Sequence, residues 1–164
     1  MQRSATGFTL VELVTVIVIL GVLGSFALPR LVDLRDEAHK TSVAGTAAAF
    51  GSAIQLAFLA CQARSYAGSD NLPEFGTGIV DFNANCFPSS TNGNNGNVNA
   101  NRCLQVWNGV LQGAPTISTP AIATTEWRAQ GSGTTCTYTY RRDTATLRRF
   151  TYSTATGAIT ISNP

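Results

Sequence analysis

A single carboxylate lies inside a long apolar stretch near the start of this 164-residue chain. The stretch covers residues 7–28 (GFTLVELVTVIVILGVLGSFAL), and Glu12 is its one charged residue. An acidic side chain at the centre of a bilayer costs roughly 2.5 kcal/mol or more, so it is rarely left there without a partner. A cut between the small Gly7 and the aromatic Phe8 would create a new amino group close to this acid. The order of these residues predicts proteolytic processing followed by assembly.

Residues 7–12 (GFTLVE) resemble the prepilin motif of type IV pilins and type II secretion pseudopilins. The resemblance implies that residues 1–7 are a leader, that a membrane prepilin peptidase cleaves between Gly7 and Phe8, and that Phe8 is then N-methylated. Pro29 also stands where many members of this family have a proline. The alternative is an ordinary secretory signal cleaved near residues 24–27 (GSFA), which include the small residues that such a site needs. Glu12 argues against that alternative, because a plain signal gains nothing from a buried acid.

From Phe8 the sequence predicts a helix of about fifty residues in two parts. Residues 8–29 are apolar on every side and, at a 1.5 Å rise, span about 30 Å, which fits a transmembrane and assembly helix. Pro29 predicts a kink or local melting near residues 24–29. Residues 30–65 are expected to form an amphipathic helix. Its apolar face recurs at steps of three and four at Val43, Ala47, Phe50, Ile54, Phe58 and Cys61, and should pack on a sheet.

Glu12 is predicted to set the register of assembly. Within one chain, the Glu12 carboxylate and the Phe8 amine are awkwardly placed because both lie near the start of the helix. Between staggered subunits, the carboxylate of one chain could meet the amine of another in a low-dielectric setting, although desolvation removes part of that attraction. The alternative is that Glu12 reaches to the headgroup level at the membrane edge.

The cysteine and histidine counts favour disulfides over a metal site. The four cysteines, at 61, 86, 103 and 136, show no CxxC spacing, and His39 is the only histidine. With an export-type N-terminus, two disulfides in an oxidising compartment are expected, and the sequence alone permits three pairings. No metal or other cofactor is expected. One histidine, paired cysteines and no paired carboxylates in the head also give no basis for an exported enzyme.

The remaining residues, 30–164, are expected to form a globular head. The sequence predicts a loop over residues 69–101, with room for a short strand around residues 78–82, and the Asn- and Gly-rich part of this loop is pinned near Cys86 and Cys103. Calcium or sugar binding there is an alternative, but carboxylates are scarce. Thr-, Tyr- and Ile-rich segments from about 120 to 162 predict an antiparallel sheet, with Cys136, Tyr138 and Tyr140 on one face. The fold class predicted is α+β: a long N-terminal helix packed on a C-terminal antiparallel sheet.

The chain is similar, more narrowly, to pilins of the mannose-sensitive haemagglutinin (MSHA) type. The similarity lies in PRL at 29–31 and DL at 33–34, in the Cys103…Pro115 block with its Val-Trp pair, and in CTYTY at 136–140. It implies the disulfides Cys61–Cys86 and Cys103–Cys136. It also implies a structural subunit, major or minor, of an adhesive pilus, in the inner membrane before assembly and then in an extracellular pilus of a Gram-negative bacterium. A pseudopilin of a type II secretion system is the alternative.

The resemblance also implies partners: other pilin subunits, prepilin peptidase, the inner-membrane assembly platform, and a surface glycan or abiotic surface. With 12% charged residues and a net charge of +2, the chain offers no electrostatic case for a dedicated nucleic-acid binder. Arginines bracket one predicted hairpin and could form a basic patch for DNA or an anionic glycan; they are Arg141, Arg142, Arg148 and Arg149. The favoured interpretation is instead a solvated hairpin whose arginine stems cover aromatic rings.

Overall fold

The computed structural model describes residues 7–93, 96–122 and 124–163, without the side chains of residues 28, 29, 31 and 32. Residues 1–6 of the predicted leader therefore lie outside the described residues. The chain divides into two compact units, Met1–Ala38 and His39–Pro164.

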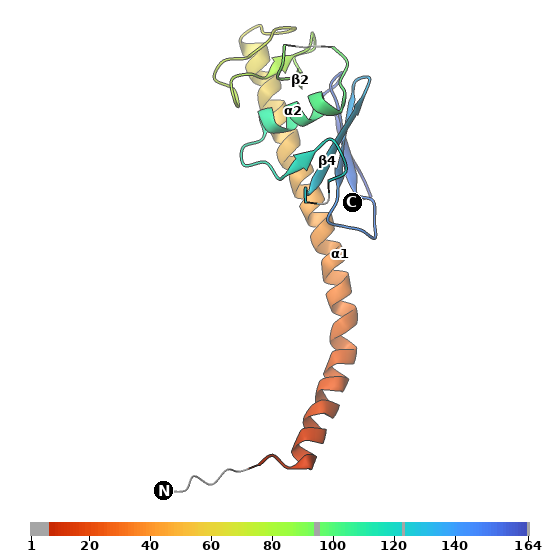
Figure 1. Ribbon diagram of the computed structural model, residues 1–164. Helices are drawn as coiled ribbons and strands as arrows, with labels where there is room; N and C mark the ends of the chain where they lie inside the picture. The colour runs from red at the N-terminus through yellow and green to blue at the C-terminus, as the bar shows by residue number, and fades with distance from the viewer. Residues whose placement is uncertain (1–6, 94–95, 123, 164) are drawn as a thin grey trace, which may run out of the picture. The chain divides into compact units, whose positions relative to one another are not determined.

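Helix α1, Leu10–Ala63, is the longest element and passes from the first unit into the second (Figure 1). The window Leu10–Ala27 has a mean hydropathy of 2.4 and is long and apolar enough to cross a membrane. The predicted melting near Pro29 is not seen, because residues 24–29 are helical. Proline removes one backbone donor but has a helix-compatible φ, so a long helix can continue past it. The amphipathic part was predicted to extend to residue 65, and the helix ends at Ala63.

The main sheet of the second unit has five strands in the order β3-β4-β5-β6-β7. Strands β4 (Trp127–Ser132), β5 (Thr135–Tyr140), β6 (Arg149–Ser153) and β7 (Ile159–Ser162) form an antiparallel meander, as the sequence predicts. Strand β3 (Ile117–Ser118) pairs in parallel with β4, so the sheet is mixed and begins before residue 120. A two-residue strand carries too short a pattern to be seen in the sequence.

The segment predicted as a loop, residues 69–101, contains a small second sheet. Strands β1 (Asp81–Phe82) and β2 (Pro88–Ser90) pair antiparallel, and all five of their residues are buried. Helix α2 (Ala100–Val110) then begins at the Asn99 cap, whose side chain accepts a hydrogen bond from the Arg102 amide. Asparagine is a favoured residue at this position because its oxygen satisfies a free amide of the first turn.

The core of the second unit is an aromatic cluster centred on Phe50 of α1. Its ring centroid lies 5.1 Å from that of Tyr138, 5.5 Å from Tyr152, 5.7 Å from Phe150 and 5.8 Å from Trp107. The predicted stripe on α1 is buried at five of its six positions. The sixth, Phe58, is half-buried and stacks on Phe87. The structure thereby confirms the α+β class, with the C-terminal half of α1 packed on the sheet.

The structure contains both disulfides implied by the resemblance to MSHA-type pilins. Cys61–Cys86 ties the end of α1 to the small sheet, and Cys103–Cys136 ties α2 to β5. Their Cα–Cα distances are 5.6 and 5.5 Å, and their sequence separations are 25 and 33 residues. In the chain-entropy account, a disulfide that closes a loop of this length stabilises a fold by about 3–4 kcal/mol.

We expect Phe50→Ala to lower the free energy of unfolding by about 3–5 kcal/mol, because it leaves a cavity among four aromatic rings. Trp107 and Trp127 lie in the same core, so tryptophan fluorescence in a urea titration reports the loss. Leu56→Ala on the exposed side of α1 is the matched control, and its side chain is 62% exposed. Equal effects of the two substitutions would show that Phe50 is not the centre of the core.

Candidate functional site

The predicted assembly residue, Glu12, lies in the first turn of α1 and is held by Thr9. The Glu12 Oε2 atom accepts hydrogen bonds from the Thr9 backbone N at 2.9 Å and from Thr9 Oγ1 at 2.8 Å. The Glu12 backbone N donates in return to Thr9 Oγ1 at 3.3 Å. This reciprocal arrangement is a capping box, in which a threonine and a glutamate three residues later satisfy each other's backbone amides.

This capping role was not predicted, although the T-x-x-E pattern of residues 9–12 is its sequence signal. The cap fixes the carboxylate at the start of the helix, where the positive end of the helix dipole also stabilises it. No described residue donates a hydrogen bond to Glu12 Oε1, and the side chain is exposed in the single chain. One carboxylate oxygen thus belongs to the cap, and the other can accept from a partner.

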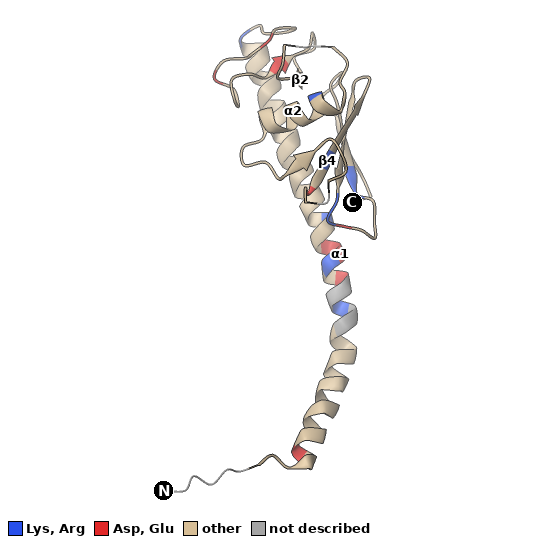
Figure 2. Cartoon of the chain, in the orientation of Figure 1, with Lys and Arg blue, Asp and Glu red and all other residues tan. Residues whose placement is uncertain are grey.

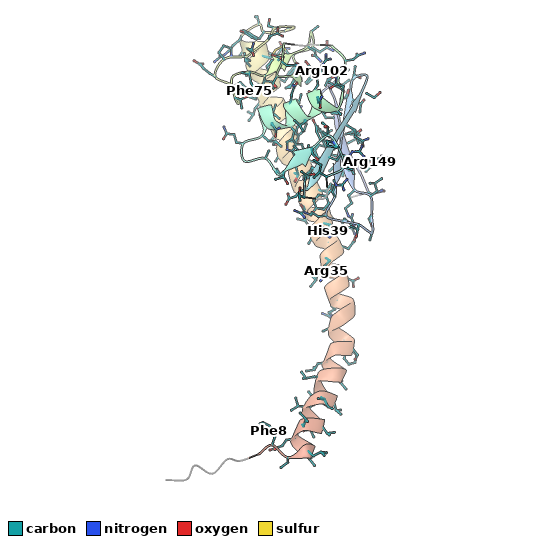
Figure 3. The ribbon with its side chains drawn as sticks, viewed as in Figure 1. Phe8, Arg35, His39, Phe75, Arg102 and Arg149 are labelled. Atoms are coloured by element: carbon teal, nitrogen blue, oxygen red, sulfur yellow. A yellow bond between two sulfur atoms is a disulfide. The ribbon has the colours of Figure 1, made fainter. Side chains whose placement is uncertain are left out.

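The helix around Glu12 exposes apolar side chains on all sides. Phe8, which Figure 3 labels at the start of the chain's helix, is 88% exposed, and Leu10 is 78% exposed. Figure 2 shows the acidic position in the first helical turn, followed by a helix without charged side chains as far as residue 27. Such a surface is stable in lipid or against other apolar helices but not in water.

Small residues on this helix leave room for a close neighbour. A Cβ added at Gly21 or Gly24 would meet no described atom within 4 Å. Small residues at lipid-exposed positions let two helix backbones approach closely, which is a common way for membrane helices to associate. The segment Leu10–Ala27 therefore combines an apolar surface, two small residues that allow close packing, and a single carboxylate.

The predicted basic patch on the hairpin is wrong for one of its four arginines. Arg148 is 2% exposed, and its Nε atom donates to Asp143 Oδ2 at 2.7 Å. Its Nη1 atom also donates to the backbone oxygen of Asn163 at 3.2 Å, which holds the C-terminal end of the chain. Arg148 directly precedes β6 and lies two residues before Phe150, so both side chains point to the core side.

Two of the tyrosines near this hairpin belong to the core and not to its solvated face. Tyr138 and Tyr152 are fully buried on the inner face of the sheet, where their hydroxyls donate to the backbone oxygens of Cys103 and Pro88. Burial raises the pKa of both phenols, so they stay neutral hydrogen-bond donors. Arg142 is exposed, and its Nη2 atom lies 4.0 Å from Glu126 Oε1.

The buried carboxylate just before the Asn-rich part of the loop is satisfied by the protein itself. Asp81 is fully buried, and its oxygens accept from the Asn71 amide at 3.0 Å, Ser90 Oγ at 2.6 Å and the Gly93 amide at 2.8 Å. Among the described residues, no group of three or more His, Cys, Asp or Glu side chains is arranged to hold a metal.

We expect Asp143→Asn to destabilise the head by about 3 kcal/mol, because it removes the carboxylate from a buried ion pair with Arg148. The Thr146 amide, with Arg148 and the Ala145 amide, holds the pKa of Asp143 below its usual value. A carboxylate with a lowered folded pKa stabilises at neutral pH, and this stability is lost as the pH falls below about 4.

Thermal unfolding at pH 7 and pH 3 measures the destabilisation by Asp143→Asn and the loss of stability at low pH. Glu74→Gln is the matched control, because Glu74 is 80% exposed and its pair with Arg64 should contribute little. The buried pair would be unimportant if the two variants melted at the same temperature at pH 7, or if Asp143→Asn retained the full acid sensitivity of the wild type.

Comparison with known proteins extends the interpretation of the first helix. Residues 2–28 match the family described as "Prokaryotic N-terminal methylation motif". The chain is 55% identical over 53 residues to "Type IV narrow pilus major component PilA5" of Thermus thermophilus, covering 32% of this chain and 46% of the relative. It is 38% identical over 55 residues to "Type II secretion system core protein G" of Klebsiella michiganensis, covering 34% and 39%.

A second protein of the same description, from Pseudomonas aeruginosa, is 34% identical over 55 residues, again covering 34% of this chain and 39% of the relative. The chain thus spans less than half the length of these curated relatives. No solved structure matches it. The N-terminal third of the chain is thus similar to the corresponding part of a type IV pilus component and of type II secretion core proteins, and its first residues match the methylation motif.

Proposed function

We propose that this protein is a structural subunit, major or minor, of a type IV pilus of the MSHA type that serves surface adhesion. In this proposal a prepilin peptidase cleaves between Gly7 and Phe8, Phe8 is N-methylated, and the subunits polymerise through α1. The observation that carries the proposal is Glu12, a single carboxylate in an exposed apolar helix that matches the methylation motif. The subunit would be a single-pass inner-membrane protein before the assembly platform adds it to an extracellular pilus.

The proposed assembly step is a charge pair between two copies of the chain. Cleavage after Gly7 leaves a positive amine on Phe8, and methylation keeps that charge. The Thr9 cap occupies Oε2 of Glu12 and leaves Oε1 for the amine of a neighbouring subunit. Because either charge alone is unfavourable in hydrocarbon, the pair favours one stagger between adjacent helices, and Gly21 and Gly24 allow the helices to pack closely.

The MSHA assignment is supported by features of the head. The Cys103–Cys136 disulfide and the buried Trp107 belong to the sequence blocks that resemble MSHA-type pilins. The Cys61–Cys86 disulfide adds a second link at the end of α1. Two buried disulfides suit a domain that works outside the cytoplasm.

A pseudopilin of a type II secretion system is the second candidate, favoured by the relatives described as core protein G. Deleting the gene in its host separates the two functions. Loss of surface fibres with normal protein secretion supports the pilus, whereas secreted proteins that accumulate in the periplasm while fibres persist support the pseudopilin.

The charge of Glu12 can be tested separately from its capping role. Glu12→Gln keeps an acceptor for Thr9 but removes the charge, and we expect fibres to disappear while processing continues. Thr9→Ala removes the side-chain half of the cap but keeps the charge, so fibres should persist with a helix weakened by about 1 kcal/mol. Electron microscopy of sheared fibres measures the yield. Normal fibres from Glu12→Gln would contradict the charge pair.

The cleavage site makes an independent prediction. Gly7→Val should block cleavage, so mass spectrometry of the membrane fraction should find the leader retained. The wild-type mature protein should begin at Phe8 and carry one added methyl group on its amine. A mature chain that begins near residues 24–27 would instead identify an ordinary secretory signal.

A further inference from the structure

The outer face of the main sheet is polar throughout strands β4 to β6, opposite the aromatic core. Alternation along each strand places one set of residues inward and the other outward. The register aligns outward residues of neighbouring strands in rows, such as Gln130, Thr137, Thr151 and Thr160. In the described structure the hydroxyls of Thr135, Thr137 and Thr139 make no hydrogen bond to protein, so each can both donate and accept.

Two arginines lie in one row of this face. Arg128 is paired with Thr139 on β5, and Thr139 is paired with Arg149 on β6. The two arginines are therefore two strand spacings apart, about 10 Å between Cα atoms. Figure 3 labels Arg149 on the sheet, where it is exposed. The Nε atom of Arg128 donates to the Thr119 backbone oxygen at 3.3 Å, which orients its guanidinium group.

The charged residues of this face favour an anionic ligand. None of the residues in β4–β7 is acidic, so an anion bound at Arg128 and Arg149 meets no opposing carboxylate on these strands. Guanidinium groups bind carboxylate and sulfate oxygens through paired hydrogen bonds. The inward tyrosines leave no aromatic platform for stacked bases, which disfavours single-stranded nucleic acid.

We propose that the outer face of β4–β7, defined by Arg128, Arg149 and the threonine rows between and beside them, binds an anionic polysaccharide. The carboxylate or sulfate groups of the polymer meet the two arginines, and its hydroxyls exchange hydrogen bonds with the threonines. The inference rests on the proposed adhesive function and names the class of surface ligand.

The test uses the full-length protein in detergent micelles and immobilised alginate, a polyuronate, with neutral dextran and duplex DNA as comparison ligands. Arg128→Gln/Arg149→Gln should weaken alginate binding about tenfold or more, because two charge-assisted contacts are lost. Arg64→Gln/Arg102→Gln removes the same net charge elsewhere on the head and should change binding by less than about twofold. Thr139→Val, between the two arginines, should weaken binding about threefold.

Three results would overturn the inference: no binding of alginate over dextran, equal loss in the two double variants, or tighter binding of duplex DNA than of alginate. Arg128→Lys/Arg149→Lys is a second test in case the glutamine variant misfolds, since it keeps the two charges and loses the paired hydrogen-bond geometry of the guanidinium groups. It should bind alginate with intermediate affinity, and wild-type affinity would contradict the guanidinium contacts.

Fibre yield separates this inference from the function on which it rests. If the wild type forms fibres that do not bind alginate, the polysaccharide inference fails and the pilus function stands. If the host makes no fibres with this subunit, the pilus function fails whether or not the purified protein binds alginate.

Discussion

Assembly depends on one constraint: a carboxylate inside an apolar helix is costly in hydrocarbon until a partner satisfies it. The structure supplies half of the answer within the chain, because Thr9 binds one oxygen of Glu12 and closes the helix end. The second oxygen has no donor among the described residues, and the surrounding side chains are exposed and apolar. A positive group from a second chain would complete the site and would at the same time order the two helices.

The same helix connects this constraint to the head. Its C-terminal half provides Phe50, the centre of the aromatic cluster, and Cys61, which is linked to the small sheet. The sheet in turn separates two chemical environments by simple alternation: aromatic rings on the inner face and threonines on the outer face. Packing is thus completed on one side, and the other side remains free to meet the surroundings.

The sequence predicted the elements that have a long, regular pattern. The stripe on α1 and the alternation of β5 both appear in the structure, because burial on one face repeats over several residues. A short strand was predicted around residues 78–82, where β1 lies, but β2 and β3 were missed because two or three residues carry no period. The disulfide pairing came from resemblance and could not come from spacing, which allows three pairings.

The roles of two side chains were predicted wrongly or incompletely, although the sequence contained the signals for the right prediction. Arg148 was counted as surface charge, although it is two residues from the inward Phe150 and five from the acid that neutralises it, Asp143. Glu12 was treated as an intermolecular partner or as an acid at the membrane edge, although Thr9 three residues earlier completes a capping box. In both cases a pairing with a residue a few positions earlier in the chain was overlooked in favour of a functional role.

The most direct test of the central claim is a distance between chains in the assembled fibre. Subunits labelled with ¹⁵N at the Phe8 amine are mixed with subunits labelled with ¹³C at the Glu12 carboxylate, and fibres are examined by solid-state NMR. The account predicts a close ¹⁵N–¹³C contact in this mixed sample, where only different chains can supply the two labels. A contact found only when both labels are on the same chain, diluted in unlabelled subunits, would contradict it.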